Sequence, residues 1–132
     1  MRIERPAWRN AVLLVSLLAY GTASLLHHVH NAEFLIEYPG MPVWLTPAGV
    51  YAAWLGVTAV GLAGYLLFRR GHRPTGLMLL GIYGMLGLYG LGHYTVAPCS
   101  AHTLTMNLTI GLEVATGVLL IVITGLMLGR RR

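Results

Sequence analysis

Residues 103–128 read TLTMNLTIGLEVATGVLLIVITGLML, an apolar run in which Glu113 is the only charged residue. The hydrocarbon core of a bilayer is about 30 Å thick, and a helix needs about 20 residues to cross it. Because hydrocarbon offers no partners to backbone N–H and C=O groups, a run of this length must satisfy them within a helix. The run therefore predicts a membrane-spanning helix over about residues 102–128.

Three further apolar runs precede this one along the chain. They predict helices over about residues 10–28, 47–68 and 74–94. A proline opens each of the last two, in the first helical turn, where its missing N–H costs nothing. The sequence is 56% hydrophobic and 10% charged, whereas soluble domains carry about 25% charged residues. We therefore expect residues 1–132 to form one all-α integral membrane domain, a four-transmembrane-helix up-and-down bundle.

The arginines predict the orientation of this bundle. The nine basic residues are all arginine, and they form three clusters: Arg2, Arg5 and Arg9, then Arg69, Arg70 and Arg73, then Arg130, Arg131 and Arg132. The segments 27–46 and 95–102 contain none. By the positive-inside rule, both termini are cytoplasmic and these two segments lie on the extracytoplasmic side of the cell (inner) membrane.

The same distribution bears on the partners of the chain. A net charge of +5 is compatible with nucleic-acid binding, but short clusters between long apolar runs do not make one basic face. The expected partners are the lipid bilayer, further copies of the chain, or another subunit of a membrane complex, and not nucleic acid.

The N-terminal segment has an alternative interpretation as a cleaved signal peptide. Basic residues, an apolar stretch and the small residues Gly21-Thr22-Ala23 fit that pattern. The apolar run, however, continues past these residues through Leu25 and Leu26. Cleavage would leave three spans and the same extracytoplasmic segments.

Glycines recur along the third predicted span. Gly81, Gly84, Gly87 and Gly90 occur at every third residue, and Gly61 and Gly64 lie on the second span. Small residues allow the backbones of membrane helices to approach closely. The pattern predicts tight packing between helices on these faces.

Five of the six histidines fall at or beyond the predicted extracytoplasmic helix ends: His27, His28, His30, His93 and His102. Helix ends on one side of an up-and-down bundle are neighbours, and imidazole suits zinc, copper, iron and nickel. The sequence therefore predicts a transition-metal site, for copper or zinc before iron. The expected ligands are His27, His30, His93 and His102, with Glu33 or Cys99 as an additional ligand. His28 is expected to point elsewhere, because the face shared by i and i+3 is that of His27 and His30.

Glu113 is the one acidic residue inside a predicted span. Ionisable groups in membranes are costly and tend to serve function. At 1.5 Å per residue, Glu113 lies about 16 Å below His102, so we do not expect it to share a metal ion with His102. It is interpreted either as a proton-carrying group or as a buried polar group hydrogen-bonded to a neighbouring helix.

The segment 31–46 contains Tyr38, two prolines and Gly40. Such residues favour a fixed turn over a mobile loop. We expect the segment to fold back over the bundle and cap the histidines.

The leading functional hypothesis is a metal-binding membrane protein, in metal handling or in redox work with a partner. Three alternatives remain open: a haem b electron-transfer protein with His27 or His28 and His93 as axial ligands, a small proton-coupled transporter using Glu113, and an accessory subunit of a membrane complex. The sequence has no Ser-His-Asp set, phosphate loop or paired carboxylates at hydrolase spacing. Whether the protein is an enzyme therefore stays open.

Overall fold

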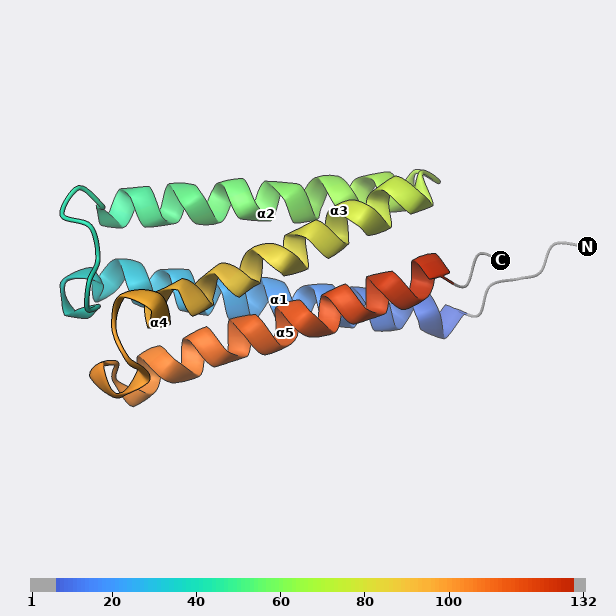
Figure 1. The fold of residues 1–132 in the computed structure, drawn as a ribbon. Coiled ribbons are helices and arrows are strands. Elements are labelled where there is room, and N and C mark those ends of the chain that lie inside the picture. Colours follow the sequence, from blue (N-terminus) through green and yellow to red (C-terminus); the bar gives the residue numbers. More distant parts are fainter. Residues whose placement is uncertain (1–6, 130–132) are drawn as a thin grey trace, which may run out of the picture.

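The computed structural model describes residues 7–129, and within that range all of its regular secondary structure is helical (Figure 1). Its elements are α1 (Ala7–Glu33), η1 (Leu35–Glu37), α2 (Pro47–Arg69), α3 (Arg73–Leu86), η2 (Gly87–Gly92), α4 (His93–Val96), η3 (Cys99–Ala101) and α5 (Leu104–Gly129), where η marks a 3₁₀ helix. Four helical stretches are long and apolar enough to cross a membrane: Trp8–Glu33, Pro47–Arg69, Arg73–Val96 and Leu104–Gly129. The prediction of an all-α bundle with four such helices is confirmed.

The long helices run up and down, so that the connections gather at two ends (Figure 1). The segments 34–46 and 97–103 lie at one end, here called the histidine end. The turn 70–72 lies at the opposite end, here called the arginine end, together with the start of α1 and the finish of α5. Arg9, Arg69, Arg70 and Arg73 belong to the arginine end. The predicted arginine clusters also include Arg2, Arg5 and Arg130–Arg132, which lie outside the described residues.

Local sequence explains where α2 begins and ends. The Thr46 hydroxyl accepts a hydrogen bond of 3.1 Å from the Gly49 backbone N–H, and Pro47 occupies the first turn. This satisfies one of the N–H groups that a helix start leaves open. Beyond Arg69, Gly71 has a φ of +93°, which glycine adopts without the steric penalty of a Cβ. The short turn to α3 depends on that residue.

The apolar core lies where α1, α3 and α5 meet. Its buried members include Leu13, Tyr20, Leu80, Tyr83 and Leu120. The outward faces of all four long helices carry exposed aliphatic side chains such as Val15, Leu62, Met78 and Leu108. A surface of this kind fits a lipid environment, because apolar side chains that face lipid tails need not be buried away from water.

Glycines bring the helix backbones into direct contact, as their spacing predicts. A Cβ atom on Gly84 of α3 would lie 2.7 Å from the carbonyl oxygen of Gly117 on α5, and one on Gly117 would lie 2.7 Å from the carbonyl oxygen of Gly84. A Cβ on Gly76 would lie 2.7 Å from the carbonyl oxygen of Gly64 on α2. These are backbone atoms, which cannot move aside as a flexible side chain can. Both helix crossings therefore require glycine.

Two expected helices differ from the structure. The first was expected to end near residue 28, but α1 continues to Glu33, because Asn31 and Ala32 are buried against the bundle. The third was expected to be one regular helix over 74–94, but it tightens into the 3₁₀ helix η2 between α3 and α4. Three glycines in η2 weaken the α-helical preference, and 3₁₀ stretches within helices often mark functional sites.

Candidate functional site

A glutamate and two histidines meet inside the bundle near its histidine end. Glu113 Oε2 lies 3.7 Å from His27 Nε2, and Glu113 Oε1 lies 3.6 Å from His28 Nδ1. Glu113 is only 2% exposed. We call His27, His28, His93, His102 and Glu113 the histidine–glutamate cluster. A carboxylate held against imidazoles within an apolar bundle is the strongest chemical feature of the described residues.

The helices place Glu113, His27 and His28 at one level. Glu113 lies on the buried face of α5, in a row that also contains Met106, Ile110 and Gly117 at helical spacing. The longer α1 sets His27 and His28 below its own end, so they reach the level of Glu113. His28 therefore meets Glu113 and does not point elsewhere as expected, whereas the expected separation of Glu113 from His102 is not contradicted, because only His27 and His28 contact the carboxylate.

His93 and His102 complete the cluster. The His93 ring packs edge to face on His27 with 5.3 Å between the ring centroids, and His102 packs on His93 at 6.0 Å. The Asn31 amide nitrogen, which can only donate, hydrogen-bonds His93 Nε2 at 3.2 Å. His93 and His102 are both buried, so the predicted convergence of His27, His93 and His102 is observed.

Three of these imidazoles use Nδ1 as a donor. His28 Nδ1 lies 2.9 Å from the carbonyl oxygen of Ser24, and His102 Nδ1 lies 3.1 Å from that of Pro98. A carbonyl can only accept, so Nδ1 carries the hydrogen in both. The Thr109 hydroxyl donates to the Met106 carbonyl at 3.0 Å, which leaves its oxygen to accept from His27 Nδ1 at 3.4 Å.

This pattern leaves Nε2 as the unprotonated nitrogen of a neutral imidazole in all three residues. Metal-binding histidines almost always donate their other ring N–H to a carbonyl or a comparable acceptor, which fixes the ring. His102 Nε2 is buried and has no hydrogen-bond partner among the described residues. An unsatisfied buried nitrogen is costly, and a metal ion or a water molecule would satisfy it.

A cavity of about 240 Å³ opens beside Glu113. Its polar lining consists of His27, His28, Asn31, His93 and Glu113, and the rest comes from α2 and the segment 86–90. Gly90 of η2 leaves room for the carboxylate, because a Cβ there would lie 3.3 Å from Glu113 Oε2. The cluster is therefore accessible to an ion or a small molecule.

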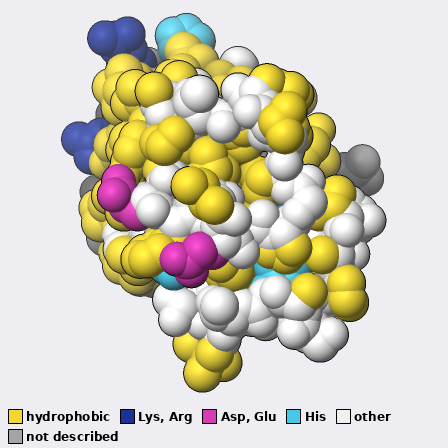
Figure 2. Space-filling view, turned by 90° about the vertical axis from the view of Figure 1, so that its left-hand side faces the viewer, with side chains coloured by type: hydrophobic (Ala, Val, Ile, Leu, Met, Phe, Trp, Pro, Cys, Tyr) yellow, Lys and Arg dark blue, Asp and Glu magenta, His cyan; other side chains and the backbone are white. Residues whose placement is uncertain are grey.

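The remaining predicted ligands lie away from the cluster. Glu33 is exposed and accepts a hydrogen bond of 2.8 Å from the Tyr51 hydroxyl. Cys99 is exposed and donates from Sγ to Asn107 Oδ1 at 3.3 Å. His30 hydrogen-bonds the Tyr38 hydroxyl. Figure 2 views the histidine end, where acidic side chains stand on the surface and histidine shows in small areas near them, apart from one histidine at the top edge of the view.

No three His, Cys, Asp or Glu side chains between residues 7 and 129 are already grouped closely enough to hold a metal ion. Metal binding at the cluster therefore requires side-chain movements that bring the donors together. Glu113 and His28 were not among the ligands predicted for the metal site, and His28 was named only as a possible axial ligand of haem b. The sequence does give one indication that Glu113 belongs to a site, because it is the only carboxylate within a predicted span.

Tyr38 closes the cluster from the histidine end, as expected for the segment 31–46. The side chain is 3% exposed, and its ring centroid lies 5.0 Å from that of His93. Burial raises the pKa of Tyr38 to about 12, so the hydroxyl stays protonated at neutral pH. A hydrogen bond of 2.9 Å joins it to His30 Nδ1.

Replacing Tyr38 with phenylalanine is expected to lower the free energy of unfolding by about 1 kcal/mol, because the hydrogen bond between the buried Tyr38 hydroxyl and the half-buried His30 is lost. Denaturant unfolding in detergent micelles measures this change. Tyr51→Phe is the matched control, since it removes a hydroxyl bonded to an exposed carboxylate, and it should change the value by less than about 0.5 kcal/mol. Equal losses in the two variants would show that Tyr38 is not a structural cap.

No protein-family model matches the chain, and no curated protein or solved structure matches it. Function is therefore argued from the chemistry of the cluster itself.

Proposed function

We propose that this protein is an integral membrane protein that binds one transition-metal ion at the histidine–glutamate cluster. The observation that carries the proposal is the contact of the Glu113 carboxylate with His27 and His28, two imidazoles that both use Nδ1 as a donor. The role we propose is metal handling or redox work with a partner, on the extracytoplasmic side of the cell membrane. Charge distribution along the sequence supports that sidedness.

The donors define the class of metal. Imidazole nitrogen and carboxylate oxygen suit zinc, copper(II) and iron, whereas thiolate and thioether donors select copper(I). Cys99 hydrogen-bonds Asn107 at the surface, so the proposed ligand set contains no thiolate. His27, His28 and Glu113 are the proposed ligands, and Asn31, His93 and His102 surround them.

Metal content tests the proposal directly. Protein purified in detergent without chelator is expected to retain about one ion per chain by elemental analysis, the usual count for one structural or catalytic site. The matched control is His72→Ala, which removes a histidine at the arginine end and should leave the metal content unchanged. Protein that retains no metal, and takes up none on dialysis against zinc, copper or iron salts, would overturn the proposal.

The haem b alternative receives less support from the cluster. A porphyrin between His27 and His93 would have to separate two rings that now pack edge to face with centroids 5.3 Å apart. A visible spectrum of the same sample decides the point, because haem ligation gives a Soret band and a bound zinc ion does not.

A proton-coupled transporter is the second candidate. The observation in its favour is the contact of Glu113 with two imidazoles within a membrane-length helix, since chains of Glu and His serve as proton relays in transporters. Its signature would be proton uptake by vesicles that contain the metal-free protein.

A further inference from the structure

A second cavity, of about 360 Å³, lies between α1, α2 and α3 at the arginine end. Seven residues line it: Asn10, Ala11, Leu14, Tyr65, Phe68, Arg69 and Arg73. The histidine–glutamate cluster lies toward the other end of the bundle and shares none of these residues. The volume falls within the range of about 300–1,000 Å³ typical of small-molecule pockets.

The chemistry of this cavity favours a phosphate group. Two arginines, Arg69 and Arg73, are among the residues that line it. Arg73 is held in place, because its Nη2 donates to Asn10 Oδ1 at 3.2 Å and its guanidinium carbon lies 4.2 Å from the centre of the Phe68 ring. A planar guanidinium fork matches phosphate oxygens in charge and in geometry. A fixed fork loses little entropy on binding.

The position of the cavity selects the source of that phosphate. Arg69 ends α2 and Arg73 begins α3, so the two charges stand where spanning helices meet the lipid headgroups. Leu14, Phe68 and Ala11 give the same cavity an apolar wall, which suits an acyl chain. Basic pockets between membrane helices are known to bind acidic lipid headgroups.

We propose that the cavity between α1, α2 and α3 is a binding site for the phosphate headgroup of an anionic phospholipid, held by Arg69 and Arg73.

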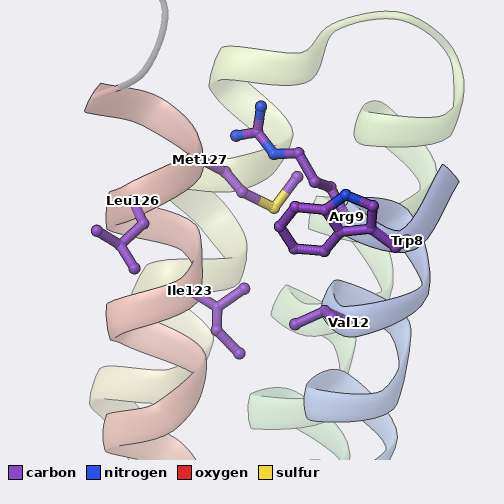
Figure 3. A pocket seen from close by; sticks show the side chains of 6 residues that line it. All are labelled: Trp8, Arg9, Val12, Ile123, Leu126 and Met127. Atoms are coloured by element: carbon purple, nitrogen blue, oxygen red, sulfur yellow. The ribbon is translucent and has the colours of Figure 1, made fainter. Parts of the chain in front are cut away.

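A neighbouring pocket supplies the contrast. It lies between α1 and α5 and is lined by Trp8, Arg9, Val12, Ile123, Leu126 and Met127. Figure 3 shows that the Arg9 guanidinium group points away from Val12 and Ile123. This pocket is lined by one arginine, which points away from it, whereas two arginines, Arg69 and Arg73, line the cavity between α1, α2 and α3.

The test compares two double variants that remove the same charge. Arg69→Gln/Arg73→Gln changes the cavity, whereas Arg9→Gln/Arg70→Gln changes two arginines of the same end that do not line it. Delipidated protein in detergent is titrated with phosphatidylglycerol, with phosphatidylcholine of identical acyl chains, and with inorganic phosphate. Native mass spectrometry measures bound lipid, and thermal unfolding measures stabilisation.

Wild type and Arg9→Gln/Arg70→Gln should bind phosphatidylglycerol alike, and Arg69→Gln/Arg73→Gln should bind it about tenfold more weakly or worse. Helical circular dichroism confirms that both variants fold. Equal losses in the two variants, or equal binding of phosphatidylcholine, would overturn the site. Equal stabilisation by inorganic phosphate alone would identify a free anion as the ligand and overturn the assignment to lipid.

Discussion

Replacing Glu113 with glutamine is expected to remove stoichiometric metal from the protein while the helical bundle stays folded. The substitution keeps the shape of the side chain and removes the carboxylate that lies 3.6 and 3.7 Å from His28 and His27. Metal affinity should fall by about 100-fold or more, since even residues around a ligand set typically change affinity by about 10–100-fold. Competition with a chromophoric chelator measures the affinity, and circular dichroism measures the fold.

Glu33→Gln is the matched control for this prediction. It makes the same chemical change at the carboxylate that the sequence favoured as a ligand, but that the structure bonds to Tyr51 at the surface. Its metal affinity should equal that of the wild type. Loss of metal in Glu33→Gln and not in Glu113→Gln would refute the ligand set proposed here. Metal retention in both, with proton uptake lost only in Glu113→Gln, would favour the transporter.

Replacing Gly117 with alanine is expected to destabilise the bundle by about 1–3 kcal/mol, the usual cost of overpacking. The new Cβ would lie 2.7 Å from the carbonyl oxygen of Gly84, so α3 and α5 would have to separate. Tyr20 also packs here, 3.4 Å from the same position. Unfolding by a denaturing detergent, followed by circular dichroism, measures the change.

Gly125→Ala provides the comparison on the same helix. Nothing lies within 4 Å of a Cβ at Gly125, so alanine should be neutral or should stabilise α5 by up to about 1 kcal/mol through its higher helix propensity. If Gly117→Ala were as stable as Gly125→Ala, the close crossing of α3 and α5 would be wrong.

Much of the fold can be predicted from the sequence, because long apolar runs that suit a bilayer are restricted to helices. Apolar length alone predicts the four long helices, and glycine spacing predicts the close crossings at Gly84 and Gly64. The convergence of His27, His93 and His102 follows from up-and-down connectivity. These features can be predicted because the spacing of residues along the sequence determines which face or end of a helix they lie on.

The partners of Glu113 could not be predicted in the same way. The apolar run of the first span stops at Leu26, so hydrophobicity predicts a helix end close to His27. In the structure α1 continues to Glu33, which sets His27 about 9 Å inside its end at 1.5 Å per residue. Glu113 lies about 13 Å inside α5 by the same measure. The polar residues that follow Leu26 continue the helix because their partners lie on other parts of the bundle, as Asn31 bonds His93. The sequence of one span does not reveal such partners.

The 3₁₀ helix η2 sets the direction of a side chain beyond it. An α-helix turns about 100° per residue and a 3₁₀ helix about 120°, so the six residues Gly87–Gly92 add about 120° of rotation. Their greater rise also adds about 3 Å of length. A third span that stayed α-helical to its end would present His93 a third of a turn away from where it now meets His27. The 3₁₀ geometry of η2 thus rotates the chain beyond it relative to a regular α-helix, and this rotation directs His93 toward His27.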